Sequence, residues 1–236
     1  MNIRSMLDQP PYVRIRAMPY LDAEQARRVY DRIGRLQDTQ RLYEGRAVAE
    51  LVAAGRFPEA HAVLEVGCGT GALAARLLER ELPPDARYLG VDLSPRMGAI
   101  ARRRVAQFGS RAEIRIADAA ESLPAEDCWA DRVVSTYVLD LLSPTRAAAL
   151  LAESARALAP GGLLCLASLT AGRGGAARLL AAAWTRLWAL RPQVVGGCRP
   201  SDMLPLLGGP EWRVESAQVV TTLGIATQVV IARRAG

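Results

Sequence analysis

The sequence contains no lysine, so all 30 of its basic residues are arginine. This absence excludes the phosphate-binding lysine of P-loop nucleotide sites, a Schiff-base lysine and the Tyr-x-x-x-Lys pair of short-chain dehydrogenases. The missing pair counts against a nicotinamide-dependent dehydrogenase. An all-arginine composition is also typical of GC-rich genomes, which weakens any argument that arginine was selected here to bind phosphate.

Residues that bind metals are also scarce. The only histidine, His61, stands just before the first expected strand, whereas ligands bind at the carboxyl ends of such strands. Asn2 is the only asparagine, which leaves an Asp-Asp-Asn magnesium site without its amide ligand. The cysteines are far apart and form no Cys-x-x-Cys pair: Cys68, Cys128, Cys165 and Cys198. The sequence therefore predicts no metal site, and reduced thiols in the cytoplasm.

Aromatic residues make up only 5% of the chain, and no apolar run approaches the ~20 residues that a membrane span requires. The N-terminal segment carries arginines where a signal peptide would need its apolar stretch. We therefore expect a cytoplasmic protein without a transmembrane segment. The net charge of +6 keeps a nucleic-acid-binding face open as an alternative, although the arginines are dispersed apart from residues 102–104.

The most informative stretch is VLEVGCGTG, residues 63–71. Its apolar, β-branched start predicts a strand, and ALAARLLER after it predicts a helix. Three alternating glycines lie between them, Gly67, Gly69 and Gly71, where the backbone can turn tightly and approach a ligand. Thr70 is the expected N-cap of the helix. Strand, glycine turn and helix together predict a nucleotide site at the carboxyl end of a sheet strand.

Acidic residues follow two further expected strands. Asp92 ends the strand 86–92, about twenty residues beyond the glycine turn, where an acid can accept both ribose hydroxyls. Asp118 ends the strand 112–118 and, with the Ala119 backbone, could bind the amino edge of adenine. Together with Glu65 in the first strand, these acids disfavour the pyrophosphate of a dinucleotide.

With these residues the chain resembles class I S-adenosylmethionine-dependent methyltransferases, and within them the ubiquinone/menaquinone and phospholipid methyltransferase-like group. The matching pieces, in family order, are VLEVGCGTG (63–71), GVDLSPRM (90–97), IADAAESLP (116–124), DRVVSTYVLDLL (131–142) and ALAPGGLLCLAS (157–168). The resemblance covers about residues 60–170. It implies S-adenosyl-L-methionine as cofactor and S-adenosyl-L-homocysteine as product. A Rossmann-like domain for another nucleotide, or an inactive copy, stays open as an alternative.

Strands alternate with helices, so we expect an α/β, Rossmann-like, doubly wound and mostly parallel sheet of seven strands. Strands are expected at 61–66, 86–92, 112–118, 130–136 and 162–168, and helices at 70–81, 95–107 and 144–158. Ser94 should cap the second of these helices, ahead of Pro95 at its first position. Residues 212–220 and 224–233 should add an antiparallel C-terminal hairpin. Residues 1–58 are expected to form an N-terminal helical cap, with helices at 22–33 and 39–54, and residues 59–236 the cofactor-binding domain.

A helical insertion is expected near 171–210. Leu180, Trp184, Leu187 and Trp188 recur there at helical spacing. Three interpretations stay open: a helix that buries its tryptophans on the sheet, a lid over an apolar acceptor, and a helix that rests on a membrane surface.

The resemblance also implies roles for individual residues. The cofactor-binding set is Tyr30, Arg46, Glu65, Gly67, Cys68, Gly69, Gly71, Asp92, Leu93, Asp118, Ala119 and Thr136. Within it, Tyr30 would reach the methionyl part and Arg46 its carboxylate, while Leu93 and Leu123 could sandwich the adenine. The loop after the fourth strand would face the acceptor, so Tyr137 and Asp140 are the candidate catalytic residues.

The predicted function is methyl transfer, by in-line displacement, to the O, N or C atom of a small, apolar or amphipathic acceptor. A methyltransferase acting on RNA or protein is one alternative. A non-catalytic domain that binds the adenosyl cofactor and regulates a partner is another. We expect a monomer or a homodimer.

Overall fold

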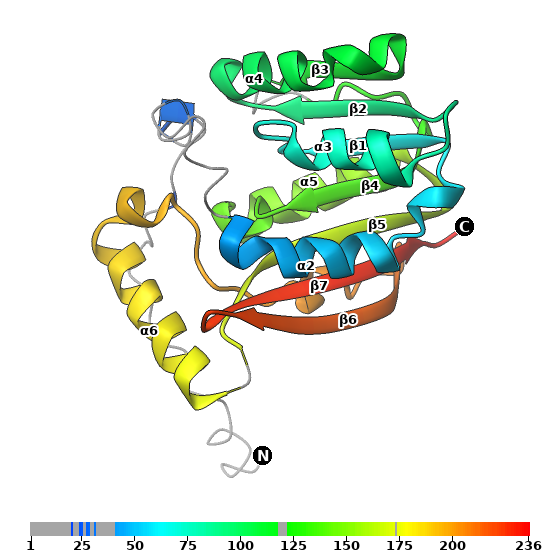
Figure 1. Cartoon of the computed structure of the whole chain (residues 1–236). Helices are drawn as coiled ribbons and strands as arrows, with labels where there is room; N and C mark the ends of the chain where they lie inside the picture. Colours follow the sequence, from blue (N-terminus) through cyan, green and yellow to red (C-terminus); the bar gives the residue numbers. More distant parts are fainter. Residues whose placement is uncertain are drawn as a thin grey trace.

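The computed structural model describes residues 41–117, 122–172 and 174–236, together with Tyr20 and residues 24–25, 27–28 and 31. Seven strands form one sheet in the order β3-β2-β1-β4-β5-β7-β6 (Figure 1). They are β1 (Ala62–Val66), β2 (Arg87–Asp92), β3 (Ala112–Ile116), β4 (Ala130–Thr136), β5 (Leu158–Thr170), β6 (Trp212–Thr222) and β7 (Ile225–Arg234). The first five strands pair in parallel, whereas β7 is antiparallel to both β5 and β6. The predicted fold class is confirmed.

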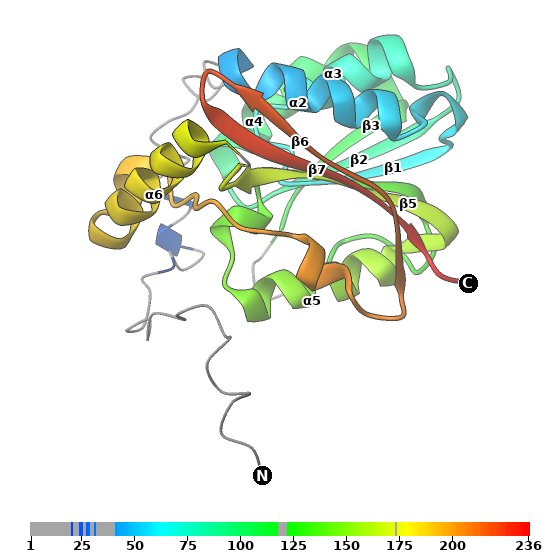
Figure 2. The ribbon, with the colours of Figure 1, turned by 90° about the horizontal axis from the view of Figure 1, so that it is seen from below.

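Helices cover both faces of the sheet (Figure 2). One face carries α2 (Arg41–Ala54), α3 (Ala72–Arg76), which continues as a π-helical turn over Leu77–Glu81, and α4 (Pro95–Val105). The other face carries α5 (Pro144–Ala157). All five residues of β1 are buried, as expected for a central parallel strand covered on both sides. Val63 accordingly packs in the core beneath α2, and Leu64 in the core beneath α5.

One of the two predicted helix caps is confirmed and the other is wrong. Ser94 caps α4, because its hydroxyl accepts a hydrogen bond from the Met97 backbone N–H at 3.1 Å. Thr70 does not cap α3. The N-cap residue is Gly71, which has a left-handed φ of 72° and makes no side-chain cap. Because Gly71 is the residue before the helix, Thr70 lies one position too early to cap it. The Thr70 hydroxyl instead accepts a hydrogen bond from Arg104 of α4 at 2.8 Å.

Other differences concern the ends of elements. Strand β5 begins at Leu158 rather than at residue 162, because Leu158 pairs with Ala130 before a register shift lets Leu163 pair with Arg132. Strand β3 ends at Ile116 rather than at residue 118. The helix predicted at 39–54 is present over Arg41–Ala54. The helix predicted at 22–33 lies mostly outside the described residues.

The insertion predicted near 171–210 holds α6 (Gly175–Leu190) and 3-10 turns at Pro192–Val195 and Leu204–Leu207. Helix α6 lies beyond one end of the sheet rather than on a face of it (Figures 1 and 2). Trp188 is fully buried and packs edge-on against Tyr20, with 5.6 Å between ring centroids. The indole N–H groups of Trp184 and Trp188 donate to the carbonyls of Cys198 and Gly197. The tryptophans therefore pack on the segment that follows α6.

Among the described helices, none combines the length and the apolar character needed to cross a membrane.

Candidate active site

The glycine turn follows β1 and is fixed to the next strand. The backbone N–H groups of Gly67 and Cys68 both donate to the Val91 carbonyl of β2, at 2.8 and 3.0 Å. All three glycines of the turn adopt positive φ, at 77°, 53° and 72°. A Cβ added to Gly67 would lie 2.3 Å from Cγ2 of Val138, in the loop after β4. Only glycine therefore fits at position 67. The close approach also shows that the glycine turn packs against the loop after β4.

Asp92, at the end of β2, holds the turn in place. Its Oδ2 accepts a hydrogen bond from the Gly69 N–H and its Oδ1 accepts one from the Ser94 N–H, both at 2.8 Å. Burial raises the pKa of this carboxyl, and these two backbone donors oppose the shift. An ionised carboxylate offers about four lone-pair sites. Asp92 can therefore accept two further hydrogen bonds from a ligand.

Glu65 lies below the turn in a buried acidic cluster. Only 2% of the residue is exposed, and its carboxylate accepts a hydrogen bond from the Tyr88 hydroxyl. Burial raises the pKa of Glu65 to about 8, Tyr88 opposes the shift and the charge of Asp92 adds to it. Burial likewise raises the pKa of the Cys68 thiol, so Cys68 is a neutral thiol at physiological pH.

Asp31 reaches the same strand end from the N-terminal segment. The Ser94 hydroxyl donates to the Asp31 carboxylate, and the Arg96 guanidinium donates to the Asp31 backbone carbonyl. Asp31 therefore lies beside Asp92, where a segment covering the crevice is expected. Tyr30, the neighbouring candidate, lies outside the described residues, and Arg46 is exposed on α2.

The loop after β3 is held by α5. Asp118 and Ala119 lie outside the described residues. Leu123 is buried, its N–H donates to the Glu153 carboxylate, and its carbonyl accepts from Arg156, both at 3.0 Å. The same arginine donates to the Ala125 carbonyl at 2.8 Å. These contacts fix the place of Leu123, while Leu93 is half-buried after β2.

Thr136 is the last residue of β4, and Tyr137 begins the loop after it. The Tyr137 backbone has a left-handed φ of 56°, and its N–H donates to the Ala167 carbonyl of β5 at 2.7 Å. Its hydroxyl lies 3.1 Å from the Thr227 hydroxyl of β7. Burial raises the pKa of Tyr137, so this phenol is a hydrogen-bonding group rather than a proton acceptor at neutral pH.

Asp140 lies one turn further along this loop and is fully buried. Its Oδ2 accepts a weak hydrogen bond from the Leu169 N–H at 3.5 Å, and its Oδ1 has no hydrogen-bond partner in the described part of the chain. Burial raises the pKa of Asp140 to about 7, and Ser168 and Arg199 oppose the shift. The Nε of Arg199 is also buried without a partner among the described residues. Asp140 therefore titrates near neutral pH inside a polar cluster.

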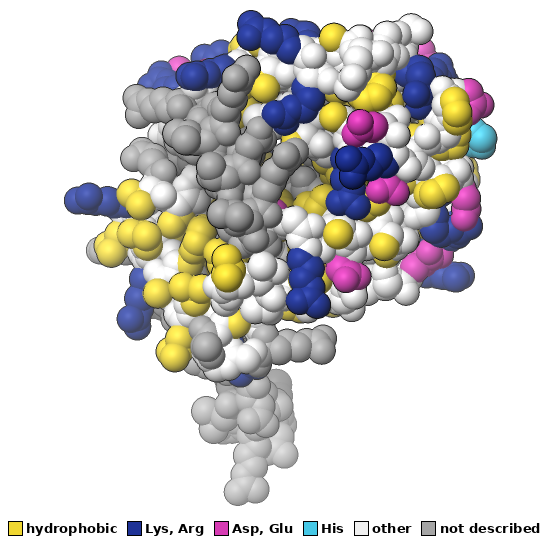
Figure 3. All heavy atoms as spheres, viewed as in Figure 1, with side chains coloured by type: hydrophobic (Ala, Val, Ile, Leu, Met, Phe, Trp, Pro, Cys, Tyr) yellow, Lys and Arg dark blue, Asp and Glu magenta, His cyan; other side chains and the backbone are white. Residues whose placement is uncertain are grey.

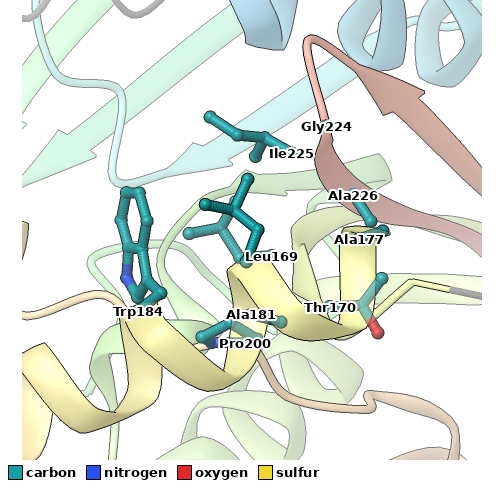
Figure 4. Close-up of a pocket in the computed structure, with 10 residues that line it drawn as sticks. Leu169, Thr170, Ala177, Ala181, Trp184, Pro200, Gly224, Ile225 and Ala226 are labelled. Carbon is teal, nitrogen blue, oxygen red and sulfur yellow. The ribbon is translucent and has the colours of Figure 1, made fainter. Parts of the chain in front are cut away.

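A small, mainly apolar pocket that opens to solvent adjoins this loop (Figure 4). Its lining comes from α6 (Ala177, Leu180, Ala181, Trp184), the end of β5 (Leu169, Thr170), the β6–β7 turn with the start of β7 (Gly224, Ile225, Ala226), and Pro200. Leu169 pairs with Thr227, the partner of the Tyr137 hydroxyl. The pocket thus begins next to the loop predicted to face the acceptor.

Residues 63–162 match the family model described as "Methyltransferase domain". The chain is 39% identical over 109 residues to the malonyl-[acyl-carrier protein] O-methyltransferase of Hahella chejuensis, which covers 46% of this chain and 37% of that protein. It is 30% identical over 120 residues to a tRNA N(3)-methylcytidine methyltransferase of Drosophila melanogaster, covering 50% of this chain and 37% of that protein. These matches support a methyltransferase domain of the class I, S-adenosylmethionine-dependent kind over residues 63–162.

A solved structure has the same fold over almost the whole length of this chain. The [4+2]-cyclase SpnF superposes with a TM-score of 0.68 at 19% identity, covering 92% of this chain and 98% of that one. By contrast, the chain spans little more than a third of the two curated relatives above. The likeness to SpnF shows the fold of almost the whole chain, and the match to the methyltransferase domain covers residues 63–162.

Three residues of this methyltransferase escaped the sequence prediction. Asp31 stands next to the candidate Tyr30 in the sequence, but its contact with Ser94 depends on the fold. Arg199 has no signal that marks it among 30 arginines, whereas Arg156 has one. A useful sign for Arg156 would have been Glu153, three residues earlier on the same helix face, with which it forms an ion pair at 2.9 Å.

Proposed function

We propose that this chain transfers a methyl group from S-adenosyl-L-methionine to a small, apolar or amphipathic acceptor. The observation that carries the proposal is that two features lie at the same end of the sheet. The first is the glycine turn, which is hydrogen-bonded to the Asp92 carboxylate, and the second is the apolar pocket beyond Tyr137. The first feature suits an adenosyl group and the second an apolar acceptor.

The residues present fit the cofactor. Two lone-pair sites on Asp92 are available for the ribose hydroxyls, and the glycines leave the backbone open beside them. In this proposal Gly67, Gly69, Gly71 and Cys68 line the methionyl part. Asp118, Ala119, Leu93 and Leu123 bind the adenine, and Glu65 faces the ammonium group through water. Tyr30, Arg46 and Thr136 complete the set. When bound, the cofactor supplies an activated methyl group on a sulfonium.

The protein's own contribution is alignment and a dry site. Effective alignment alone can supply ~7–11 kcal/mol of the barrier. The loop after β4 lies between the glycine turn, through Val138, and the apolar pocket, through Tyr137, so it can align the two reactants. Asp140 is the candidate base for an acceptor that must lose a proton, because its carboxyl titrates near neutral pH.

The acceptor class follows from the pocket. Among the described residues of its lining, only Thr170 brings a side-chain hydroxyl, and the Trp184 N–H already donates to the Cys198 carbonyl. Such a lining can hold an alkyl or ring portion of a molecule but offers little to a charged one. We therefore infer an acceptor with an apolar part in this pocket and its reacting atom towards Tyr137.

An RNA acceptor is the second candidate, since the chain carries a net charge of +6 and one relative is a tRNA methyltransferase. Many arginines, however, are engaged within the fold. Arg102, Arg111 and Arg132 donate to backbone carbonyls, as do Arg156, Arg233 and Arg234. Of the run 102–104, Arg104 is bound to Thr70. The dispersal of the charge favours the small molecule over RNA.

We also propose one folded unit in which residues 1–58 form the cap and residues 59–236 the cofactor-binding domain, as a monomer or a homodimer. Leu51 of α2 supports this, because it packs in the same core as Cys165 of β5 and Ile231 of β7.

The test is incubation of the protein with S-adenosyl-L-methionine carrying an isotopically labelled methyl group and a metabolite and lipid extract. Mass spectrometry should find label in a small organic-soluble molecule, together with S-adenosyl-L-homocysteine. Label that enters only the RNA fraction, and is lost after ribonuclease treatment, would replace the acceptor class by RNA. Binding of the cofactor without label transfer to any fraction would favour the non-catalytic alternative.

A further inference from the structure

Exposed apolar side chains gather around α6. Leu179 and Leu190 are 74% and 80% exposed, and they lie on the side of the helix opposite the buried Ala177 and Trp188. Together with the neighbouring exposed side chains they form what we call the leucine rim: Leu179, Leu180, Leu187, Leu190, Val194 and Leu223. Figure 3 shows hydrophobic side chains over this part of the molecule with basic side chains at its margins. Isolated exposed apolar side chains are ordinary, but five leucines and one valine on and beside one helix mark an interaction surface.

Among the described residues from the start of α6 to Ser201, all charged side chains are arginines. Arg178, Arg186 and Arg191 are exposed on or next to α6. Within the described part of the chain, none of the three forms an ion pair with an acidic side chain. The sequence from residue 154 to residue 201 contains no aspartate and no glutamate. The surface therefore combines leucines with unneutralised arginines.

The leucine rim borders the mouth of the apolar pocket. Leu180 belongs to both, since it lines the pocket and is 40% exposed. A Cβ on Gly224 would lie 3.4 Å from Leu180, so the β6–β7 turn that carries Leu223, itself 80% exposed, is next to α6. Whatever covers the rim therefore also covers the entrance to the pocket.

We propose that the leucine rim docks on a membrane surface that contains anionic lipids, with α6 parallel to the bilayer plane. Interfacial helices combine leucines, which enter the boundary of the acyl chains, with arginines, which bind the lipid phosphates. A second copy of this chain fits less well, because a two-fold contact would bring the arginines of both copies together without a single acid from residues 154–201. Nucleic acid fits less well too, because it offers nothing to leucines that are 74% and 80% exposed.

Docking in this orientation places the pocket mouth against the bilayer. An amphipathic acceptor could then pass from the membrane into the pocket without crossing water. This consequence rests on the proposed function, whereas the docking itself does not.

The test is co-sedimentation of the purified full chain with large unilamellar vesicles. Vesicles of phosphatidylcholine should bind it weakly, and vesicles with about 30% phosphatidylglycerol should bind it about tenfold or more better. The double variant Leu179→Ser, Leu190→Ser should reduce binding to anionic vesicles about tenfold or more, since two exposed apolar anchors are lost. The triple variant Arg178→Gln, Arg186→Gln, Arg191→Gln should lower it by a similar factor, and about 0.5 M NaCl should weaken the wild type.

Val214→Ser is the matched control, because Val214 is also apolar and exposed, at 39%, but lies on β6 away from α6. It should bind vesicles as the wild type does. Wild-type binding that is absent, or unchanged in the leucine double variant, would overturn the proposal. So would gel filtration that shows a wild-type dimer which the leucine variant converts to monomer, because a second copy would then cover the rim. None of these measurements uses methyl transfer, so a failure of the proposed function would leave them unaffected.

Discussion

Replacing Asp92 by asparagine should remove most of the affinity for the cofactor. Both carboxylate oxygens accept a backbone N–H at 2.8 Å, so an amide at this position must turn its NH₂ group towards the N–H of Gly69 or of Ser94. The same change removes one of the two acceptors proposed for the ribose. Hydrogen bonds to a charged group contribute ~1.5–3 kcal/mol each. With one such bond to the ribose lost, the expected loss is ~1.5–3 kcal/mol, or roughly 10- to 10²-fold in Kd.

The assay is isothermal titration calorimetry with S-adenosyl-L-homocysteine, with thermal unfolding measured in parallel. Asp131→Asn is the control. The Oδ2 of Asp131 also accepts two backbone N–H groups, from His61 at 2.7 Å and Ala62 at 3.3 Å, but at the opposite end of β1. The control should change stability slightly and cofactor affinity hardly at all. An Asp92→Asn protein that folds and binds within about twofold of the wild type would refute the role given to Asp92.

Three further variants test the same site. Gly67→Ala should abolish cofactor binding and lower the melting temperature in a thermal scan, because its Cβ would lie 2.3 Å from Val138 at a φ of 77°; an unchanged scan would contradict this geometry. Stability of the wild type in urea should fall as pH rises from about 4 to about 8, since the pKa of Glu65 is raised to about 8 in the folded state above an unfolded value of about 4.3. In Glu65→Gln, the decrease in the free energy of unfolding over this pH range should be smaller by a few kcal/mol. An equal decrease in both proteins would show that Glu65 does not titrate in this range. Arg156→Gln should weaken cofactor binding severalfold in calorimetry by releasing the Leu123 loop, and native affinity would show that the loop holds without this arginine.

The sheet could be predicted because its strands are short apolar runs punctuated by glycine and proline. The pairing of strand ends also follows from sequence, since the carboxyl ends of parallel strands meet at one edge. Asp92 is therefore expected near the glycine turn, and the structure shows its hydrogen bond to the Gly69 N–H.

What the sequence could not reveal depends on contacts between distant segments. Thr70 has the chemistry of a helix cap, yet the N-cap residue is Gly71, which has a left-handed backbone conformation. The Thr70 hydroxyl instead accepts a hydrogen bond from Arg104. The early start of β5 depends on its pairing with Ala130. Arg199 lies with its guanidinium 4.8 Å from the Tyr20 ring centroid, a contact between residues far apart in the chain that no local pattern encodes.

The most direct test is a crystal structure of this chain with S-adenosyl-L-homocysteine. The account predicts that both ribose hydroxyls lie within hydrogen-bonding distance of the Asp92 carboxylate, with the sulfur between the glycine turn and Tyr137. An adenosyl group bound elsewhere, or a crevice at Asp92 that prefers a pyrophosphate-bearing compound, would contradict it.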